Sequence, residues 1–241
     1  MVTRESSLFL VVSRRPLRDT EEILEGLCDS CDRLSVVVRR GKGGSVGVCE
    51  PPSLVQGLVS QGRSLSHLSQ VVLVDAFAAM RGDLERLATA GFLGRLYLAA
   101  LAPGDGFGEA FRVLSALFDA LNKGVSPLSA GLWGQDRLLG LLGIAPDFES
   151  CLNCGSSRVA GFSSREGGVL CNACYSGSGF ALSCDALKLC QEIRAAELGA
   201  LNSPSRDVLS LVGRVYREQF VQHAGVSREL FRRVISRGDK V

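Results

Sequence analysis

The sequence predicts an α+β protein, with a small β-barrel or sandwich at the N-terminus and helices after it. Apolar runs typical of strands, separated by Gly, Pro and Ser, fill residues 1–78. Helical spacing of apolar residues begins near residue 79. Cysteines, glycines and serines interrupt that spacing over 148–182. We therefore expect a first domain at 1–78, a helical domain formed by 79–147 and 183–241, and a cysteine-rich insertion at 148–182 between its two parts.

The strand predictions rest on short runs of β-branched and large apolar residues. A Gly-Lys-Gly-Gly sequence at 41–44 predicts a turn between two of these runs. The segment EEILEGLC at 21–28 fits either a strand or a helix. The other runs predict strands at 7–13, 34–40, 45–49 and 70–78.

The helix predictions rest on apolar positions that recur at i, i+3, i+4 and i+7. The clearest stripe is formed by Ala110, Val113, Leu114, Leu117, Phe118 and Leu121. Ser183 is a candidate N-cap for the helix that follows the insertion. Further helices are expected in 79–101, from Leu132 to Ile144, at 204–222 and at 227–236.

Composition excludes several classes of protein. With 46% hydrophobic and 22% charged residues among 241, the chain has enough apolar material for a core, which excludes disorder as its main state. A net charge of +2 does not indicate a uniformly basic protein. The apolar run Leu8 to Val12 is too short for a signal peptide, and no stretch is apolar enough for a membrane span. We expect a cytosolic protein whose nine cysteines are reduced.

Two Cys-x-x-Cys pairs are the strongest motif in the chain. Cys151 and Cys154 form the first pair, and Cys171 and Cys174 form the second, with sixteen residues between the pairs. This spacing is typical of a zinc site in which each pair supplies two sulfurs to one tetrahedral ion. Four protein sulfurs leave no open position, so we expect one structural Zn²⁺. The alternatives are free thiols at a chance spacing and an iron–sulfur cluster, and both fit less well.

The remaining cysteines have less specific contexts. Cys28 and Cys31 form another Cys-x-x-Cys pair, which could be redox-active. The βαβ context of such motifs is missing here, so two unpaired thiols in a turn are favoured. Cys49, Cys184 and Cys190 lie in apolar contexts and are expected to be small buried residues.

Local basic clusters are candidate DNA-binding residues. Strand ends and their loops gather on one rim of a small barrel, where cations would attract a phosphate backbone. Solvated turns are the alternative interpretation. The five candidates end the first strand and the basic strand at 34–40, or follow the latter: Arg14, Arg15, Arg39, Arg40 and Lys42. A second cluster, near the C-terminus, is by default a solvated helix face: Arg228, Arg232, Arg233 and Arg237.

No catalytic constellation is predicted. His67 and His223 are the only histidines, and their surroundings indicate surface or capping residues. The glycine-rich sequence at 41–44 lacks the P-loop pattern. The carboxylates are dispersed along the chain. A binding protein is therefore favoured over an enzyme.

Three passages make the chain resemble the bacterial RecO family of recombination mediators. The first is VVSRRPLRDTEEILEGL at 11–27, and the second is RLSVVVRRGKGG at 33–44. The third and most specific is LLGLLGIAPDFESCLNCG at 138–155, continued by FSSREGGVLCNAC at 162–174. The chain departs from the family before its second basic strand, where Cys31-Asp32 stands in a turn that usually carries Gly.

The resemblance implies an N-terminal OB-fold barrel, a helical domain and a zinc-ribbon insertion. It implies binding of single- and double-stranded DNA, annealing of complementary strands, and no enzymatic turnover. It also implies action with RecR and help in loading RecA onto DNA coated by single-strand binding protein. Two alternatives stay open: a zinc-ribbon scaffold whose barrel binds protein, and a thiol oxidoreductase that uses Cys28 and Cys31.

Overall fold

The structure is a computed structural model that describes residues 4–39, 46–60, 65–103, 108–175, 177, 179–199 and 204–235. The chain divides into two compact units, Met1–Pro127 and Leu128–Val241. Within these ranges, the first unit contains a β-barrel and three α-helices, and the second contains four α-helices and a small sheet. No helix in the described ranges combines the length and apolarity needed to span a membrane.

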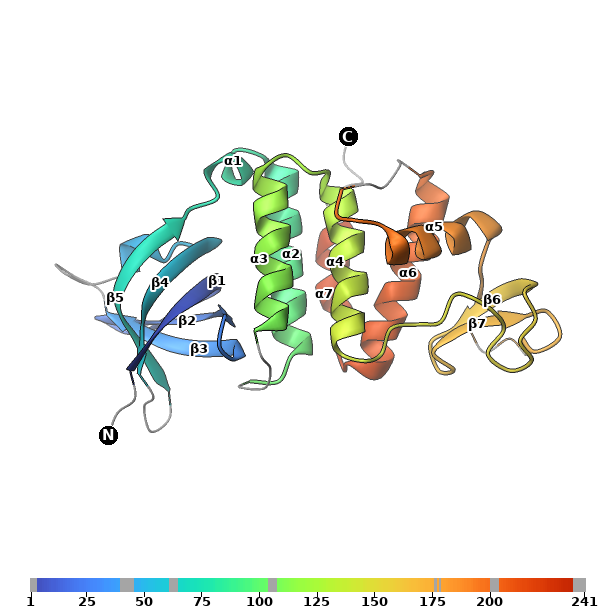
Figure 1. Cartoon of the computed structure of the whole chain (residues 1–241), viewed down its shortest axis with the longest axis horizontal. Coiled ribbons are helices and arrows are strands. Elements are labelled where there is room, and N and C mark those ends of the chain that lie inside the picture. The colour runs from blue at the N-terminus through green and yellow to red at the C-terminus, as the bar shows by residue number, and fades with distance from the viewer. Residues whose placement is uncertain are drawn as a thin grey trace. The chain divides into compact units, whose positions relative to one another are not determined.

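The first unit begins with a closed five-stranded barrel, seen in blue and cyan in Figure 1. Neighbouring strands follow the order β1-β2-β3-β5-β4, and β4 closes the barrel against β1. Only the β3–β5 pairing is parallel among the described strands, which is the strand arrangement of an OB-fold. The strands are β1 (Arg4–Arg18), β2 (Glu21–Cys28), β3 (Asp32–Arg39), β4 (Ser53–Ser60) and β5 (Ser66–Asp75).

Inward-facing residues fill the barrel with aliphatic side chains and one aromatic ring. They alternate along each strand, as the two-residue period of a strand requires. The buried cluster consists of Phe9, Val11, Leu24, Cys28, Val36, Val38, Cys49, Val55 and Leu68. The barrel confirms the predicted fold class and shows that the ambiguous segment 21–28 is a strand.

The predicted strand at 45–49 is wrong. Residues Val46–Val48 form a 3-10 turn, η1, and the Cys49 side chain enters the barrel core from the irregular chain that follows. The remaining strand of the barrel is β4, for which the sequence analysis predicted no strand. Burial alternates along the first part of β4, where Val55 is buried and the next residue, Gln56, is exposed. The pairing of β4 with β1 and β5 stabilises this strand, and β1 is distant from it in the sequence.

Helices α1 (Ala78–Arg81), α2 (Leu84–Ala100) and α3 (Glu109–Asn122) complete the first unit. The α2 helix packs on β1 and β2, and α3 packs on β2 and β3 beside α2. Helix α2 approaches β1 closely at Gly94. A β-carbon at this position would lie 2.6 Å from Cγ1 of Val12, so the contact needs a residue without a side chain. The two helices therefore cover part of the outer barrel face formed by β1, β2 and β3.

The second unit contains α4 (Pro127–Leu141), α5 (Cys184–Ala195), α6 (Arg206–His223) and α7 (Arg228–Ile235). Ser183 caps α5 as predicted, since its hydroxyl accepts a hydrogen bond from the backbone N–H of Ala186. The buried Asp136 of α4 ties three helices together. Its carboxylate accepts hydrogen bonds from Arg194 of α5, at 2.8 Å, and from the hydroxyl of Tyr216 of α6.

Between α4 and α5 the chain forms a three-stranded antiparallel sheet in the order β7-β6-β8 (Figure 1). The strands are β6 (Val159–Ser163), β7 (Gly168–Cys171) and β8 (Phe180–Ala181). Three rings, Phe148, Phe162 and Phe180, pack together as its apolar centre. Asp147 joins the sheet through a parallel bridge to Gly168, which fixes the chain between α4 and the first cysteine pair.

Candidate metal centre and nucleic-acid interface

The sulfur atoms of the four cysteines predicted to bind zinc lie close together. The sulfurs of Cys151, Cys154, Cys171 and Cys174 all lie within 4.8 Å of one another. A tetrahedral ion with Zn–S bonds of about 2.3 Å holds its sulfurs about 3.8 Å apart. The sulfurs of Cys154 and Cys171 are 3.6 Å apart, so the cluster has the dimensions of a Cys₄ zinc site.

Tight turns bring both members of each pair to the centre. In the first, the Gly155 N–H donates to the carbonyl of Cys151 at 2.8 Å, and Gly155 has a φ of 71°, which is the left-handed region that glycine adopts at no steric cost. In the second, the N–H of Tyr175 donates to the carbonyl of Cys171 at 2.8 Å. The second turn directly follows β7, so the sheet sets the distance between the two pairs.

The electrostatics of the cluster also fit a bound cation. A hydrogen bond from the Cys171 backbone lowers the pKa of the Cys151 thiol to about 6, against the opposing effect of burial. A hydrogen bond to the Cys154 sulfur raises the pKa of Cys174 to about 12. Four thiolates this close repel one another, so protons or a cation must be present between them. The chemistry of four sulfurs and no carboxylate favours a soft or borderline ion such as Zn²⁺.

The predicted DNA contacts gather at one end of the barrel. The ends of β1 and β3 both lie beside Glu21, the first residue of β2. Arg15 and Arg39 are exposed there, and Arg15 has no ion pair among the residues that the structure describes. Arg40 and Lys42 lie outside the described residues. Arg14, Arg15 and Arg39 are the three of the five candidates that lie within the described residues.

Arg14 differs from the other two because acids surround it. Its Nη2 lies 2.7 Å from Oε2 of Glu50, and its Nε lies 4.0 Å from Oε2 of the buried Glu22. Arg81 of α1 positions Glu50, since its guanidinium donates to the carbonyls of Glu50 and Pro52, each at 2.7 Å. These contacts link β1, β2 and the chain before β4, which is a structural role for Arg14.

Arg18 was missed by the sequence reading. It lies opposite Glu21 in the β1–β2 ladder, its Nη1 is 3.8 Å from Oε2 of that residue, and its side chain is exposed. The signal was present in the sequence as three arginines among the five residues of RRPLR at 14–18. The exposed basic group described at this end of the barrel is therefore Arg15, Arg18 and Arg39.

The other candidate residues have structural explanations. Cys28 is buried at the end of β2, and its sulfur contacts the hydroxyl of Ser30 at 3.2 Å, while Cys31 lies in the following turn. None of Cys28, Cys31, Cys49 and Cys190 forms a disulfide, and Cys49 and Cys190 are buried as expected. The expectation for Cys184 is wrong. It is exposed, because it is the first residue of α5 and lies off the buried face formed by Ala186, Leu189, Cys190 and Ile193.

Both histidines and two of the C-terminal arginines, Arg228 and Arg232, lie at the surface. His67 is exposed on β5, and His223, at the end of α6, hydrogen-bonds with the carbonyl of Ser164. Arg228 pairs with Glu218 of α6 at 2.6 Å, and Arg232 is exposed. The side chain of Arg233 and the whole of Arg237 lie outside the described residues.

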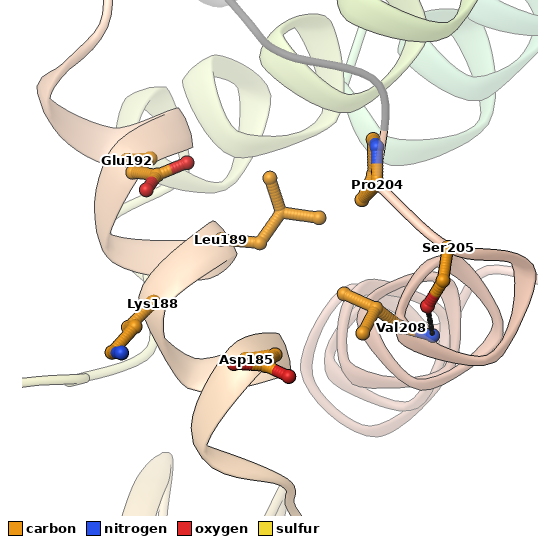
Figure 2. Close-up of a pocket in the computed structure, with 7 residues that line it drawn as sticks. All are labelled: Asp185, Lys188, Leu189, Glu192, Pro204, Ser205 and Val208. Atoms are coloured by element: carbon orange, nitrogen blue, oxygen red, sulfur yellow. Dashed lines mark hydrogen bonds between the residues drawn. The ribbon is translucent and has the colours of Figure 1, made fainter.

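A groove of about 340 Å³ lies between α5 and the start of α6 (Figure 2). Leu189 of α5 and Val208 of α6 line its apolar part, with Pro204 beside them. Ser205 caps α6, since its hydroxyl accepts from the N–H of Val208. Asp185, Lys188 and Glu192 complete the lining.

The family model and the relatives to which this chain is similar all belong to one family. Residues 81–228 match the family described as Recombination protein O C terminal. The DNA repair protein RecO of Anaeromyxobacter sp. strain K is 32% identical over 188 residues, which cover 73% of each chain. The DNA repair protein RecO of Rubrobacter xylanophilus is 31% identical over 199 residues, covering 78% of this chain and 77% of the relative. That of Alkaliphilus metalliredigens is 26% identical over 183 residues, covering 73% and 74%.

Proposed function

This chain belongs to the RecO family of DNA repair proteins, and on that basis we propose that it binds DNA at the end of the barrel where β1 and β3 finish. The observation that carries the proposal is the set of exposed arginines there: Arg15, Arg18 and Arg39. The β2–β3 face and the loop between β1 and β2 are where OB-folds bind oligonucleotides. Helices α2 and α3 cover part of that face, which leaves this end accessible.

In this proposal the protein anneals complementary strands and, with RecR, helps to load RecA onto DNA coated by single-strand binding protein. It acts at the nucleoid, without catalytic turnover. Annealing needs a surface that neutralises phosphates on two strands without reading bases, and arginines provide such contacts. Phe9, which could have stacked on bases, is buried inside the barrel. Binding should therefore be mainly electrostatic.

We also propose that Cys151, Cys154, Cys171 and Cys174 hold one structural Zn²⁺. The ion would neutralise the thiolates and tie the turn after Cys151 to the turn after β7. Besides the three aromatic rings, the described core of this insertion consists of a small cluster around Leu170 and the cysteines, and so small a core needs a further cross-link. This role is structural, since four sulfurs fill the tetrahedral shell.

The test is binding of a fluorescent single-stranded oligonucleotide at about 50 and about 200 mM salt. Three phosphate contacts predict roughly a twentyfold loss of affinity over this range, and five contacts roughly a hundredfold loss. The Arg15→Glu/Arg39→Glu double variant should lose most of the binding. Arg95→Glu, at an exposed position on α2, is the control for a charge reversal elsewhere and should bind nearly as well as the wild type.

The second candidate is a protein-interaction scaffold that does not touch DNA directly. It is favoured by three consecutive exposed aliphatic residues on β5, namely Val72, Leu73 and Val74. An exposed apolar strand of this kind is more typical of a protein contact than of a DNA contact. No oligonucleotide binding by the wild type at about 50 mM salt would favour this candidate over the first.

A further inference from the structure

We propose that Glu21 is a built-in competitor of DNA phosphates for Arg18 and Arg39, so that one carboxylate limits the DNA affinity of the barrel end. This inference rests on the DNA binding proposed above. It assigns a role to an acidic residue in a surface that would otherwise be described by its arginines alone.

The register of the barrel places Glu21 between the two arginines. Glu21 is directly opposite Arg18 in the β1–β2 ladder and directly opposite Arg39 in the β2–β3 ladder. Residues opposite one another in an antiparallel pair lie on the same face. The Glu21 carboxylate lies 3.8 Å from Nη1 of Arg18 and 4.0 Å from Nε of Arg39. The three side chains form a row across three strands with one negative charge between two positive charges.

The exposed fractions of the three side chains indicate which of them can move away from the others. The side chains of Arg18 and Arg39 are 78% and 84% exposed, whereas that of Glu21 is only 17% exposed. Both distances exceed the length of a hydrogen bond, and exposed ion pairs of this kind are weak. A phosphate can therefore draw either guanidinium away from Glu21, but it must first overcome the attraction of the carboxylate.

Arg14 provides the contrast within the same strand. It makes a 2.7 Å contact with Glu50, lies near the buried Glu22, and its side chain is 35% exposed, less than half the exposed fraction of Arg18 or Arg39. A phosphate would have to break a short ion pair and leave two carboxylates without their cation. We therefore assign phosphate binding to Arg18 in place of Arg14, next to Arg15 and Arg39.

The test compares Glu21→Gln with Glu25→Gln in the full chain, using a fluorescent oligothymidine at about 100 mM salt. Both changes remove one negative charge from β2, so both reduce the general repulsion of DNA equally. Glu25 contacts the hydroxyl of Ser13 at 3.0 Å and has no arginine partner in the described ranges. Release of two arginines should make Glu21→Gln bind about fivefold more tightly than the wild type, and Glu25→Gln less than about twofold.

A double-mutant cycle isolates the contact from the general field. In an Arg18→Gln/Arg39→Gln background, Glu21→Gln should improve binding less than about twofold. Equal effects of Glu21→Gln and Glu25→Gln, or a fivefold effect that persists in this background, would overturn the inference while leaving the proposed function intact. Absence of binding by the wild type and by folded Glu21→Gln alike would overturn both. Thermal melting of each variant verifies that it is folded.

Discussion

Asp32 adopts a backbone conformation that is uncommon for a residue with a side chain. Its φ is 47°, in the left-handed region, where Asp and Asn are better tolerated than most residues. The side chain is nearly buried, and its Oδ1 accepts a hydrogen bond from the backbone N–H of Phe111 at 3.1 Å. The N-cap residue of α3 is Gly108, which has no side chain to supply. Asp32 therefore caps a helix whose N-cap residue, Gly108, lies 76 residues later in the sequence.

Replacing Asp32 should separate the cost of the backbone from the cost of the lost cap. Asp32→Ala leaves the Phe111 N–H without its acceptor and should lower the free energy of unfolding by about 2 kcal/mol. Asp32→Gly relieves the left-handed conformation and should cost less than Ala. Asp32→Asn keeps an acceptor and should cost least. Urea unfolding of the three variants tests this order, and an Asn variant as unstable as Ala would contradict it.

Cys190 predicts a pH dependence at the alkaline end. Burial, and then the charge of Asp136, raise the pKa of this thiol to about 12 from an ordinary value of 9.0. Above pH 9 the thiol ionises in the unfolded chain but not in the folded one. Its contribution to stability is therefore complete below pH 9 and is lost as the pH rises from 9 towards 12. The loss should be on the order of 1 kcal/mol at pH 10.

The measurement is urea unfolding at pH 7.5 and pH 10 under reducing conditions. The Cys190→Ala variant no longer has this titration, so its stability should fall less between the two pH values than that of the wild type. Cys184→Ala, at the exposed first residue of the same helix, is the matched control and should follow the wild type. Identical pH dependence of all three proteins would refute the expected contribution of Cys190.

At the scale of elements, α2 shows how the helical layer is attached to the barrel. The helix has two glycines, three residues apart, in different surroundings. A β-carbon at Gly94 would meet Cγ1 of Val12 in β1, whereas a β-carbon at Gly91 would have no neighbour within 4 Å. Packing against β1 thus requires glycine at position 94. Gly91 lowers the stability of the helix and makes no contact that would need a glycine.

This difference predicts opposite effects of the same substitution. Gly91→Ala should raise the free energy of unfolding by about 0.5–1 kcal/mol, because alanine loses less backbone entropy in a helix. Gly94→Ala should lower it by about 1–3 kcal/mol, since α2 or β1 must shift to avoid the overlap. Thermal unfolding of both variants tests this. Equal effects of the two substitutions would show that α2 does not dock on β1 through Gly94.

At the scale of the whole molecule, the two compact units should respond differently to loss of the metal. The cysteine cluster lies entirely in the second unit, and the barrel core consists of different residues. If the four sulfurs hold Zn²⁺, their coordination contributes directly to the folding of residues 148–182. The barrel strands have no part in that coordination.

Chelation of zinc, or Cys171→Ser, should lower the melting temperature of the second unit by roughly 5–10 °C. Amide hydrogen exchange followed by mass spectrometry should show lost protection in β6 and β7 and unchanged protection in β1–β5. Cys31→Ser, in the other Cys-x-x-Cys pair, should retain zinc and leave β6 and β7 protected. Unchanged melting of Cys171→Ser, together with no bound zinc in the wild type, would show that the cluster is not a metal site.

The sequence by itself determined the features that depend on local spacing. The cluster of four cysteines was predictable because a two-residue spacer lets both thiols of a pair face one point, and that spacing is visible in the sequence. The stripe from Ala110 to Leu121 identified α3, since helical periodicity is a local property. The helical region and the cysteine-rich segment were also within reach of the sequence, but the barrel strands were only partly so, because 45–49 is not a strand and β4 was not predicted.

Only the tertiary structure decided the features that depend on long-range pairing. Strand β4 is held by partners on both sides, and Cys49 leaves the predicted strand at 45–49 to fill the barrel core. The register of β1, β2 and β3 decides that Arg14 is held by acids while Arg18 faces solvent beside Glu21. The physical reason is the same throughout. Charge, burial and capping depend on which residues of distant segments become neighbours, and the spacing within one segment contains no information about that.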